Sequence, residues 1–465
     1  MMGRPLDLMD KKVPIWKLVF KLAWPAVVEQ LLQTIVGYVD TAMVGNIGVA
    51  ATAAVGVTTS TVWMINGFMN AAGVGYAVQV AHHLGAGDTE KARAVVRQAM
   101  LAILALGSIL TVLVVFIVAP NLPIWMRVEE NVKPLAAAYF RILGMTYLFN
   151  IALVLCSNIL RCAGDTKTPM KYNILTNVIN VIGNYFLIYP TAEVSLFGHA
   201  FVLPRAGLGV QGAAIATAIS ITFSGVCMLL VIFKRKSPIQ IHLREDFSPQ
   251  PIVIRQVVRL GIPIALERMT ISMGHIASTA MISGLGTVSL AANQLASTGE
   301  SLCYMPVNGF SMAGTTLVAQ HLGADEGDRA YQSGRWAIRL AVLVMIVCSA
   351  AMYLFAWPII DIFSNDLQAI ALGAAMLRIE AFAEPFQAIG VVIGGILNGA
   401  GDNKWPFYIS ILGMWVVRLP VALLLIKICH WGLEAIWVAM IVDWVVRASI
   451  SGVRFYRKRW MTVWN

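Results

Sequence analysis

Long apolar runs dominate the pattern of hydrophobic and polar positions along the chain, and short polar stretches separate them. Most runs approach the roughly 20 residues that a helix needs to cross a bilayer. Lipid offers no hydrogen-bond partners to open backbone groups, so such runs are expected to form helices. We therefore predict an all-α integral membrane protein with twelve transmembrane helices. The predicted spans are 16–44, 52–82, 98–119, 137–160, 170–190, 208–233, 254–284, 288–320, 336–362, 370–397, 406–429 and 432–454.

The same polar positions recur inside apolar segments half a chain apart. Residues 24–56 (WPAVVEQLLQTIVGYVDTAMVGNIGVAATAAVG) align with residues 262–294 (IPIALERMTISMGHIASTAMISGLGTVSLAANQ) at an offset of 238 positions. Two further matches follow in the same order: VAHHLGAGDTEKA with VAQHLGADEGDRA, and ILRCAGDTKTP with ILNGAGDNKWP. Three ordered matches over most of the chain predict an internal duplication.

The duplication divides the chain into two pseudo-symmetric lobes of six spans each. Residues 1–233 form the predicted N-lobe and residues 254–465 the predicted C-lobe. The polar, proline-containing stretch 234–253 is interpreted as a cytoplasmic linker. Because six is an even number, both lobes enter the membrane in the same direction. Paired bundles of this kind are typical of transporters whose substrate site lies between the halves.

Composition and charge support a membrane protein and exclude a nucleic-acid surface. Only 12% of the residues are charged, against about a quarter in ordinary soluble domains. The net charge of +10 comes from Lys and Arg that gather at alternate ends of the spans. With the N-terminus inside, the outer loops hold only Arg127, Lys133, Arg205 and Lys427. This bias places both termini in the cytoplasm and predicts a multi-pass protein of the plasma (inner) membrane with no nucleic-acid partner.

The HLGAGD and AGDTKTP motifs lie at predicted cytoplasmic helix ends. Glycine permits a tight turn there, and aspartate can cap the following helix. We interpret both motifs, together with His82, His83 and His321, as braces of the inner hairpins, with no catalytic or metal-binding role. A phosphate-binding loop at residues 85–87 is excluded, because no strand precedes it and no GKS/T follows.

Taken together, these segments resemble the multidrug and toxic compound extrusion (MATE) family, nearer its NorM-type branch. The resemblance rests on PAVVEQLLQTIVGYVDTAMVG, VAHHLGAGD, LRCAGDTKTP and the NxxNxxxN run of the fifth span, and it covers nearly the whole chain. It implies a two-lobe, V-shaped exporter that exchanges organic substrates for H⁺ or Na⁺ by alternating access. We expect cationic or amphipathic small molecules as substrates, membrane lipid as surroundings and a monomer. No enzyme activity, bound metal or cofactor is expected besides the coupling ion.

Asp40 is the foremost candidate for cation coupling. Charged side chains at lipid depth are costly to insert and usually functional. Asp40 is flanked by Gly37, Val39 and Ala42, and no Lys or Arg lies near it in sequence. A carboxyl group in such surroundings can bind and release a proton near neutral pH.

The fifth span supplies candidate partners at spacings of three and four residues. Asn177, Asn180 and Asn184 share one helix face, and amide oxygens can ligate Na⁺ or accept a hydrogen bond from a protonated carboxyl. The resemblance implies that this face meets the first-span aspartate. Some family members carry Asp at the last site, so Asn184 removes one titratable group. Alternatively, the three amides are plain inter-helix hydrogen bonds worth about 1 kcal/mol each.

The C-lobe does not copy this chemistry, because the counterpart of Asp40 is Ser278. Instead it places Glu267 in the seventh span and Glu380 and Glu384 one turn apart in the tenth. Paired acids favour one H⁺ or Na⁺ bound between them, so these three residues are predicted to take part in cation coupling. The NorM-type resemblance implies cation-binding acids in the same two helices, though not at identical positions.

Two arginines complicate the C-lobe prediction. An ion pair of Glu267 with its neighbour Arg268 would prevent proton exchange. Asp443 and Arg447, four residues apart in the last span, are interpreted as an internal ion pair with a structural role.

A permissive substrate cavity is predicted between the lobes, since thioether side chains repack around varied ligands. Glu29 lies on the same helix face as Asp40, eleven residues before it and therefore roughly 16 Å away along the first span. It either marks a polar path toward the cytoplasm or pairs with a basic residue near the inner surface. The predicted lining is Glu29, Gln33, Tyr38, Met43, Met64, Met273 and Met281.

Two alternatives come from other functional classes. A flippase for lipid-linked precursors would be expected to line its cavity with several Arg or Lys for pyrophosphate. Only Arg141, Arg268, Arg378, Arg418 and Arg447 approach membrane depth here. A membrane-embedded hydrolase finds no support, since neither HExxH nor GxSxG occurs.

Overall fold

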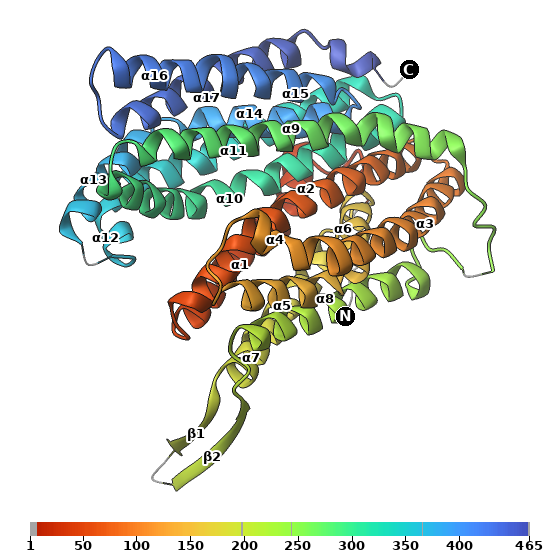
Figure 1. The fold of residues 1–465 in the computed structure, drawn as a ribbon. Helices are drawn as coiled ribbons and strands as arrows, with labels where there is room; N and C mark the ends of the chain where they lie inside the picture. Colours follow the sequence, from red (N-terminus) through yellow and green to blue (C-terminus); the bar gives the residue numbers. More distant parts are fainter. Residues whose placement is uncertain (1–6, 197–198, 243, 365, 464–465) are drawn as a thin grey trace.

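Helices account for nearly all of the computed structural model, which describes residues 7–196, 199–242, 244–364 and 366–463 (Figure 1). Several spans are made of two consecutive segments. In the first half the segments are α1 (Ile15–Gly45), α2 (Val49–Gly85), α3 (Thr89–Leu113), the π-helical η1 (Val114–Val118), α4 (Ala119–Trp125), α5 (Lys133–Gly144), α6 (Tyr147–Cys162), α7 (Lys167–Ile188) and α8 (Gly209–Lys234).

The second half repeats this order of long and broken helices. Its segments are α9 (Pro251–Ser283), α10 (Thr287–Gly323), α11 (Gly327–Leu354), α12 (Ala356–Asp361), α13 (Leu367–Glu380), α14 (Glu384–Gly399), α15 (Lys404–Ile411), the π-helical η2 (Leu412–Arg418), α16 (Leu419–Lys427), α17 (Glu434–Tyr456) and the 3-10 turn η3 (Arg459–Thr462). Every predicted span thus coincides with helix, although the helices extend beyond several of the predicted limits.

Most of the spans that composition alone does not mark as membrane-crossing lie at the contact between the two lobes. Within the part of the chain that the structure describes, five continuous helical stretches can cross a membrane by length and composition, and the bent pairs α5–α6 and α13–α14 raise this number to seven. The other spans are α1, α2, α7, α9 and α10. Four of these form the contact between the lobes, where α1 packs against α10 and α2 packs against α9 and α10. Some of their polar residues, such as Thr58 of α2 and Ser278 of α9, are accordingly buried in the protein.

The first half of α1 packs into the C-lobe. Leu18, Val19 and Leu22 are buried in a core with α10, α11 and α14. In the same way, Val257 near the start of α9 belongs to the main core of the N-lobe. Each lobe thus holds the beginning of the other lobe's first helix.

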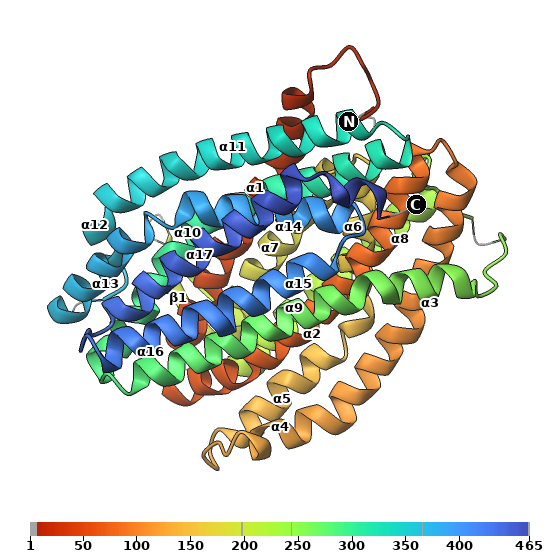
Figure 2. The ribbon, with the colours of Figure 1, turned by 90° about the horizontal axis from the view of Figure 1, so that it is seen from above.

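Two equivalent glycines let α2 and α10 cross closely. A Cβ atom on Gly85 would lie 1.9 Å from the carbonyl oxygen of Gln320, and one on Gly323 would lie 2.0 Å from that of His82. The Gln320 side chain also donates to the carbonyl of Cys162 across the two lobes, at 2.7 Å. The lobes are therefore closed against each other where α2 and α10 end, toward the end of the bundle at which both termini lie (Figure 2).

The two loop motifs brace helix ends as predicted. Asp88 caps α3 by accepting from the backbone N–H of Lys91 at 3.0 Å. Asp165 accepts from the N–H of Thr168 at 3.1 Å and pairs with Arg235. Its counterpart Asp402 pairs with Arg454 at 2.6 Å. Each lobe thus ties this motif to the end of its last helix.

A β-hairpin interrupts the otherwise helical chain between α7 and α8. β1 (Pro190–Leu196) pairs antiparallel with β2 (His199–Ala206), with Ala192 opposite Leu203. It projects from the end of the bundle opposite the termini (Figure 1). No strand was expected here, because these segments of 7 and 8 residues are too short to be recognised as membrane spans.

Candidate functional site

Asp40 lies in the second half of α1, half-buried against α7 and α8. Asn184 donates to Asp40 Oδ1 at 2.6 Å. The Asn180 amide satisfies both of its neighbours in one orientation. Its nitrogen then donates to the two Asp40 carboxylate oxygens, at 2.8 and 2.9 Å, and its oxygen accepts from Thr217 Oγ1 at 3.0 Å. The structure thus brings Asp40 together with two of the three predicted asparagines.

Thr217 of α8 completes this N-lobe cluster, and the sequence analysis missed it. A usable pattern existed, because Thr217, Ser220 and Ser224 follow one face of α8 at spacings of three and four. Ser224 meets Thr176 of α7 in the same way that Thr217 meets Asn180. Matched polar faces on successive spans would have indicated that they pair.

Asn177, the third predicted asparagine, lies apart from the carboxylate. It shares the α7 face, but no hydrogen bond joins it to Asp40 in the described part of the chain, and its buried Nδ2 has no partner there. The N-lobe cluster therefore consists of Asp40, Asn180, Asn184 and Thr217.

Glu29 is 2% exposed and engaged in a buried ion pair. Its Oε1 accepts from Arg161 of α6 and from Asn173 of α7, the latter at 2.6 Å. Pairing with a basic residue was one of the two interpretations open for Glu29. The prediction that Glu29 lines a substrate cavity is accordingly corrected, because its carboxylate is covered by protein.

The other predicted cavity residues fall into three groups. Tyr38 joins the lobes, since its hydroxyl donates to the carbonyl of Thr298 at 2.8 Å and lies 2.5 Å from Ser301 Oγ. Gln33 is exposed and donates to Asn173 at 3.4 Å. Met43 and Met281 are partly buried against apolar cores, whereas Met64 and Met273 are exposed.

In the C-lobe, Glu380 and Glu384 flank a break in the tenth span. α13 ends at Glu380, α14 begins at Glu384, and the two helices meet at 58°. Both residues are 0% exposed, and none of their carboxylate oxygens has a hydrogen-bond partner among the described residues. The N-lobe breaks its fourth span at the equivalent place, between α5 and α6, but carries Leu143 and Tyr147 there. Both lobes therefore share the bend, but of the two only the C-lobe carries acidic residues at these positions.

Glu300 of α10 is a third acid of this C-lobe cluster, and the sequence analysis missed it. Its carboxyl group interacts electrostatically with those of Glu380 and Glu384. Its sequence neighbours, STGESL, show no helical pattern of polar residues. Nothing in the sequence could therefore indicate which acids the α10 side chain meets.

Asp443 is held by two arginines beside these glutamates. Arg447 Nε lies 2.6 Å from Asp443 Oδ1, which confirms the predicted ion pair, and Arg418 Nε lies 2.8 Å from Oδ2. Arg418 closes the π-helical segment η2, a distortion frequent at functional sites. Both arginines are thus bound to Asp443, and the three glutamates remain an excess of acid.

Glu267 makes the same kind of hydrogen bond as Glu29, its N-lobe counterpart, but has no arginine in the place of Arg161. Its Oε1 accepts from Ser410 Oγ at 3.2 Å, as Glu29 accepts from Asn173, the equivalent residue. Asn398 replaces Arg161 in the C-lobe. Among the described residues Glu267 forms no ion pair, with Arg268 or any other cation.

The fold and the two acid clusters together indicate the class of protein. A duplicated twelve-span bundle with closely packed lobes and acids set between its helices is the architecture of a membrane transport protein. Comparison with known proteins identifies the family. The MatE family model matches residues 25–186 and again 263–424, so the match repeats with the duplication. The chain belongs to the MatE family, the multidrug and toxic compound extrusion transporters.

Relatives of the whole chain lead to the same family. The chain is 31% identical over 461 residues to the "Probable multidrug resistance protein NorM" of Thermotoga maritima, covering 97% of this chain and 95% of the relative. It is 25% identical to the "Uncharacterized transporter YisQ" of Bacillus subtilis, covering 96% and 94%. The predicted family resemblance is confirmed.

Solved structures show the same fold. A MOP superfamily transporter from Pyrococcus furiosus superposes with a TM-score of 0.89 at 22% identity, covering 98% of both chains. An outward-facing multidrug resistance MATE transporter gives 0.88 at 21% identity, covering 99% of both chains. The predicted all-α, twelve-span, two-lobe class is confirmed.

Proposed function

We propose that the protein is a secondary active exporter that moves organic compounds outward in exchange for inward H⁺ or Na⁺. The observation that carries this proposal is the N-lobe cluster, in which a half-buried Asp40 meets Asn180 and Asn184. Carboxylate, amide and hydroxyl oxygens together suit Na⁺, a hard cation. The same carboxylate can instead take up a proton, so the cluster accommodates either coupling ion.

Cation binding at Asp40 changes hydrogen bonding that spans three helices. The ionised carboxylate accepts from both amides, whereas a protonated carboxyl also needs an acceptor. Rotating the Asn180 amide would supply that acceptor and reverse its bond with Thr217 of α8, whose hydroxyl can donate or accept. Tyr38, on α1 near Asp40, bonds to α10 of the other lobe. A shift of α1 in response to the cation therefore reaches the contact between the lobes and can favour one of two states.

The C-lobe cluster supports a cationic substrate or a second coupling ion. Glu300, Glu380 and Glu384 lie together, while Arg418 and Arg447 are already paired with Asp443. Buried negative charge without compensation is strongly unfavourable. Bound protons, Na⁺ or an organic cation must therefore balance this cluster.

We place both termini in the cytoplasm of a plasma (inner) membrane protein that acts as a monomer, with residues 234–253 linking the lobes. The distribution of Lys and Arg supports this orientation. In this orientation the closed crossing at Gly85 and Gly323 lies on the cytoplasmic side. The names of the NorM relatives support drug-like organic compounds as substrates.

The flippase alternative is less well supported. A pyrophosphate site needs several unpaired cations, yet two of the five arginines near membrane depth, Arg418 and Arg447, both pair with Asp443.

Efflux of a cationic dye from proteoliposomes tests the proposal. Na⁺ and H⁺ gradients are imposed separately on the wild-type protein, with protein-free liposomes as the control. We expect one or both gradients to drive dye movement against its own gradient. Dye movement that is equal with and without every imposed cation gradient would refute coupled export.

A further inference from the structure

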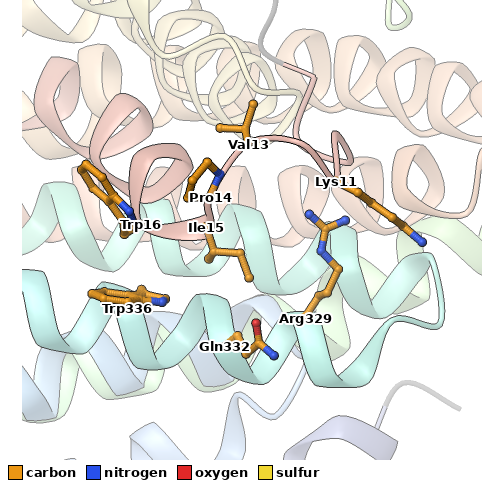
Figure 3. A pocket seen from close by; sticks show the side chains of 8 residues that line it. All are labelled: Lys11, Val13, Pro14, Ile15, Trp16, Arg329, Gln332 and Trp336. Atoms are coloured by element: carbon orange, nitrogen blue, oxygen red, sulfur yellow. The ribbon is translucent and has the colours of Figure 1, made fainter.

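A cavity of about 500 Å³ lies away from both acid clusters, between the start of α1 and the first turns of α11. Figure 3 shows Lys11 and Arg329 at one end and the indole rings of Trp16 and Trp336 at the other. The full lining is Lys11, Val13, Pro14, Ile15, Trp16, Arg329, Gln332 and Trp336.

Polarity changes along the cavity in the direction of the membrane. Arg329 lies in the first turn of α11, and Trp336 follows two turns deeper. Beyond Trp336, the same face of α11 exposes Leu343 and Val347, which are 61% and 64% accessible. Trp16 of α1 is itself 42% exposed. Arg339 Cζ lies 5.3 Å from the ring centre of Trp336, so positive charge reaches the level of the indole. Aliphatic surface follows beyond it, as the acyl region of a phospholipid follows its headgroup.

The charged end of the cavity carries more positive than negative charge. Lys11 Nζ lies 3.0 Å from Glu326 Oε1, and Arg329 Nη1 lies 3.2 Å from Oε2 of the same residue. One carboxylate therefore serves two cations. Lys17 Nζ adds a third cation, 5.4 Å from the ring centre of Trp16. This excess favours an anionic ligand.

The equivalent place in the N-lobe is closed and has no indole rings. The counterparts of Trp336 and Trp16 are Gln98 and Ile254. Gln98 donates to the carbonyl of Ser248 at 2.8 Å and accepts from the N–H of Gln250 at 3.0 Å. The linker thereby covers this place in the N-lobe. The duplication produced two equivalent positions. The N-lobe copy keeps Lys91 as the counterpart of Arg329 but is covered by the linker, whereas the C-lobe copy is open and aromatic.

We propose that this cavity binds an anionic glycerophospholipid, with the phosphate beside Lys11 at the basic end and the acyl chains along Trp16 and Trp336. Basic pockets between transmembrane helices on the cytoplasmic side are suited to such headgroups. A bound lipid would join the start of α1 to α11, the place where the N-terminal segment meets the C-lobe.

Native mass spectrometry of the full chain in detergent tests the proposal with phosphatidylglycerol and phosphatidylcholine of identical acyl chains. The wild-type protein is expected to retain phosphatidylglycerol in preference. Lys11→Gln should lower phosphatidylglycerol binding about fivefold, since one Lys or Arg near a lipid surface contributes roughly 1 kcal/mol. Lys12→Gln is the matched control, because this exposed neighbour does not line the cavity. Lys11 is 76% exposed, so its replacement does not threaten folding.

Two further arms separate a lipid from a soluble phosphate ligand. Trp336→Gln, which copies the N-lobe residue, should weaken binding of the lipid and leave binding of glycerol phosphate unchanged. Equal retention of both lipids by the wild type, or equal losses with Lys11→Gln and Lys12→Gln, would overturn the proposal. Displacement of the lipid by glycerol phosphate at equal concentration would overturn it as well, in favour of a soluble anion. None of these measurements requires transport, so they succeed or fail independently of the proposed exporter function.

Discussion

Removing Arg161 should destabilise the N-lobe by leaving the Glu29 carboxylate buried without a cation. Glu29 is 2% exposed, and its partners are Arg161 and Asn173. Removing one member of a buried ion pair costs about 3–5 kcal/mol. We expect a loss of this size for Arg161→Met, measured as the free energy of unfolding in detergent micelles.

The double variant Glu29→Gln/Arg161→Met shows whether charge is the cause. Without the carboxylate no buried charge remains, so the double variant should be more stable than Arg161→Met alone, with a coupling energy of about 1–3 kcal/mol. Glu267→Gln is the matched control in the C-lobe. Its carboxylate accepts only from Ser410 among the described residues, so the expected loss is about 1 kcal/mol. The reasoning fails if the double variant loses the sum of the two single losses.

Two further substitutions test the closed crossing and the C-lobe acids. Gly85→Ala places a Cβ 1.9 Å from a carbonyl oxygen of α10, so the helices must separate, and Cys162 beside this crossing should react faster with a thiol reagent. Gly394→Ala, which meets no atom within 4 Å, should leave the Cys162 rate unchanged, and equal rates in both variants would contradict the predicted separation. Glu380→Gln and Glu384→Gln each remove a buried charge and no hydrogen bond to the described residues, so folding should be retained while affinity for a cationic dye falls about tenfold. Dye affinity equal to wild type in both variants would remove the C-lobe cluster from substrate binding.

The spans and the duplication could be predicted because helical periodicity and internal repeats can be read directly from the chain. The contact of α1 with α7 was implied only by the family resemblance. Asp40 and the asparagine face were also read directly from the chain. Asn177 shows the limit of the method, since it shares that face and still lies outside the cluster. Periodicity gives a face, whereas a contact depends on where along the neighbouring helix the two faces cross.

Long-range partners could not be predicted from one sequence. Glu29 had several basic residues available, and its actual partner Arg161 lies 132 positions away. Glu300 joins Glu380 and Glu384 through the packing of α10 against α13 and α14. Helix packing sets such contacts, and no local pattern records them. The bends of the fourth and tenth spans coincide when the two lobes are aligned. The repeat could therefore have indicated that these two spans share a break.

The central claim is that loading Asp40 with a cation drives export, and one substitution tests it directly. Asp40→Asn keeps a side chain of the same size and removes the group that binds H⁺ or Na⁺. In proteoliposomes under the gradient that drives the wild-type protein, we expect this variant to fold, insert and bind dye but to lose gradient-driven efflux. Ser278→Ala, the equivalent position of the C-lobe, should transport at the wild-type rate. Efflux by Asp40→Asn at the wild-type rate would contradict the account.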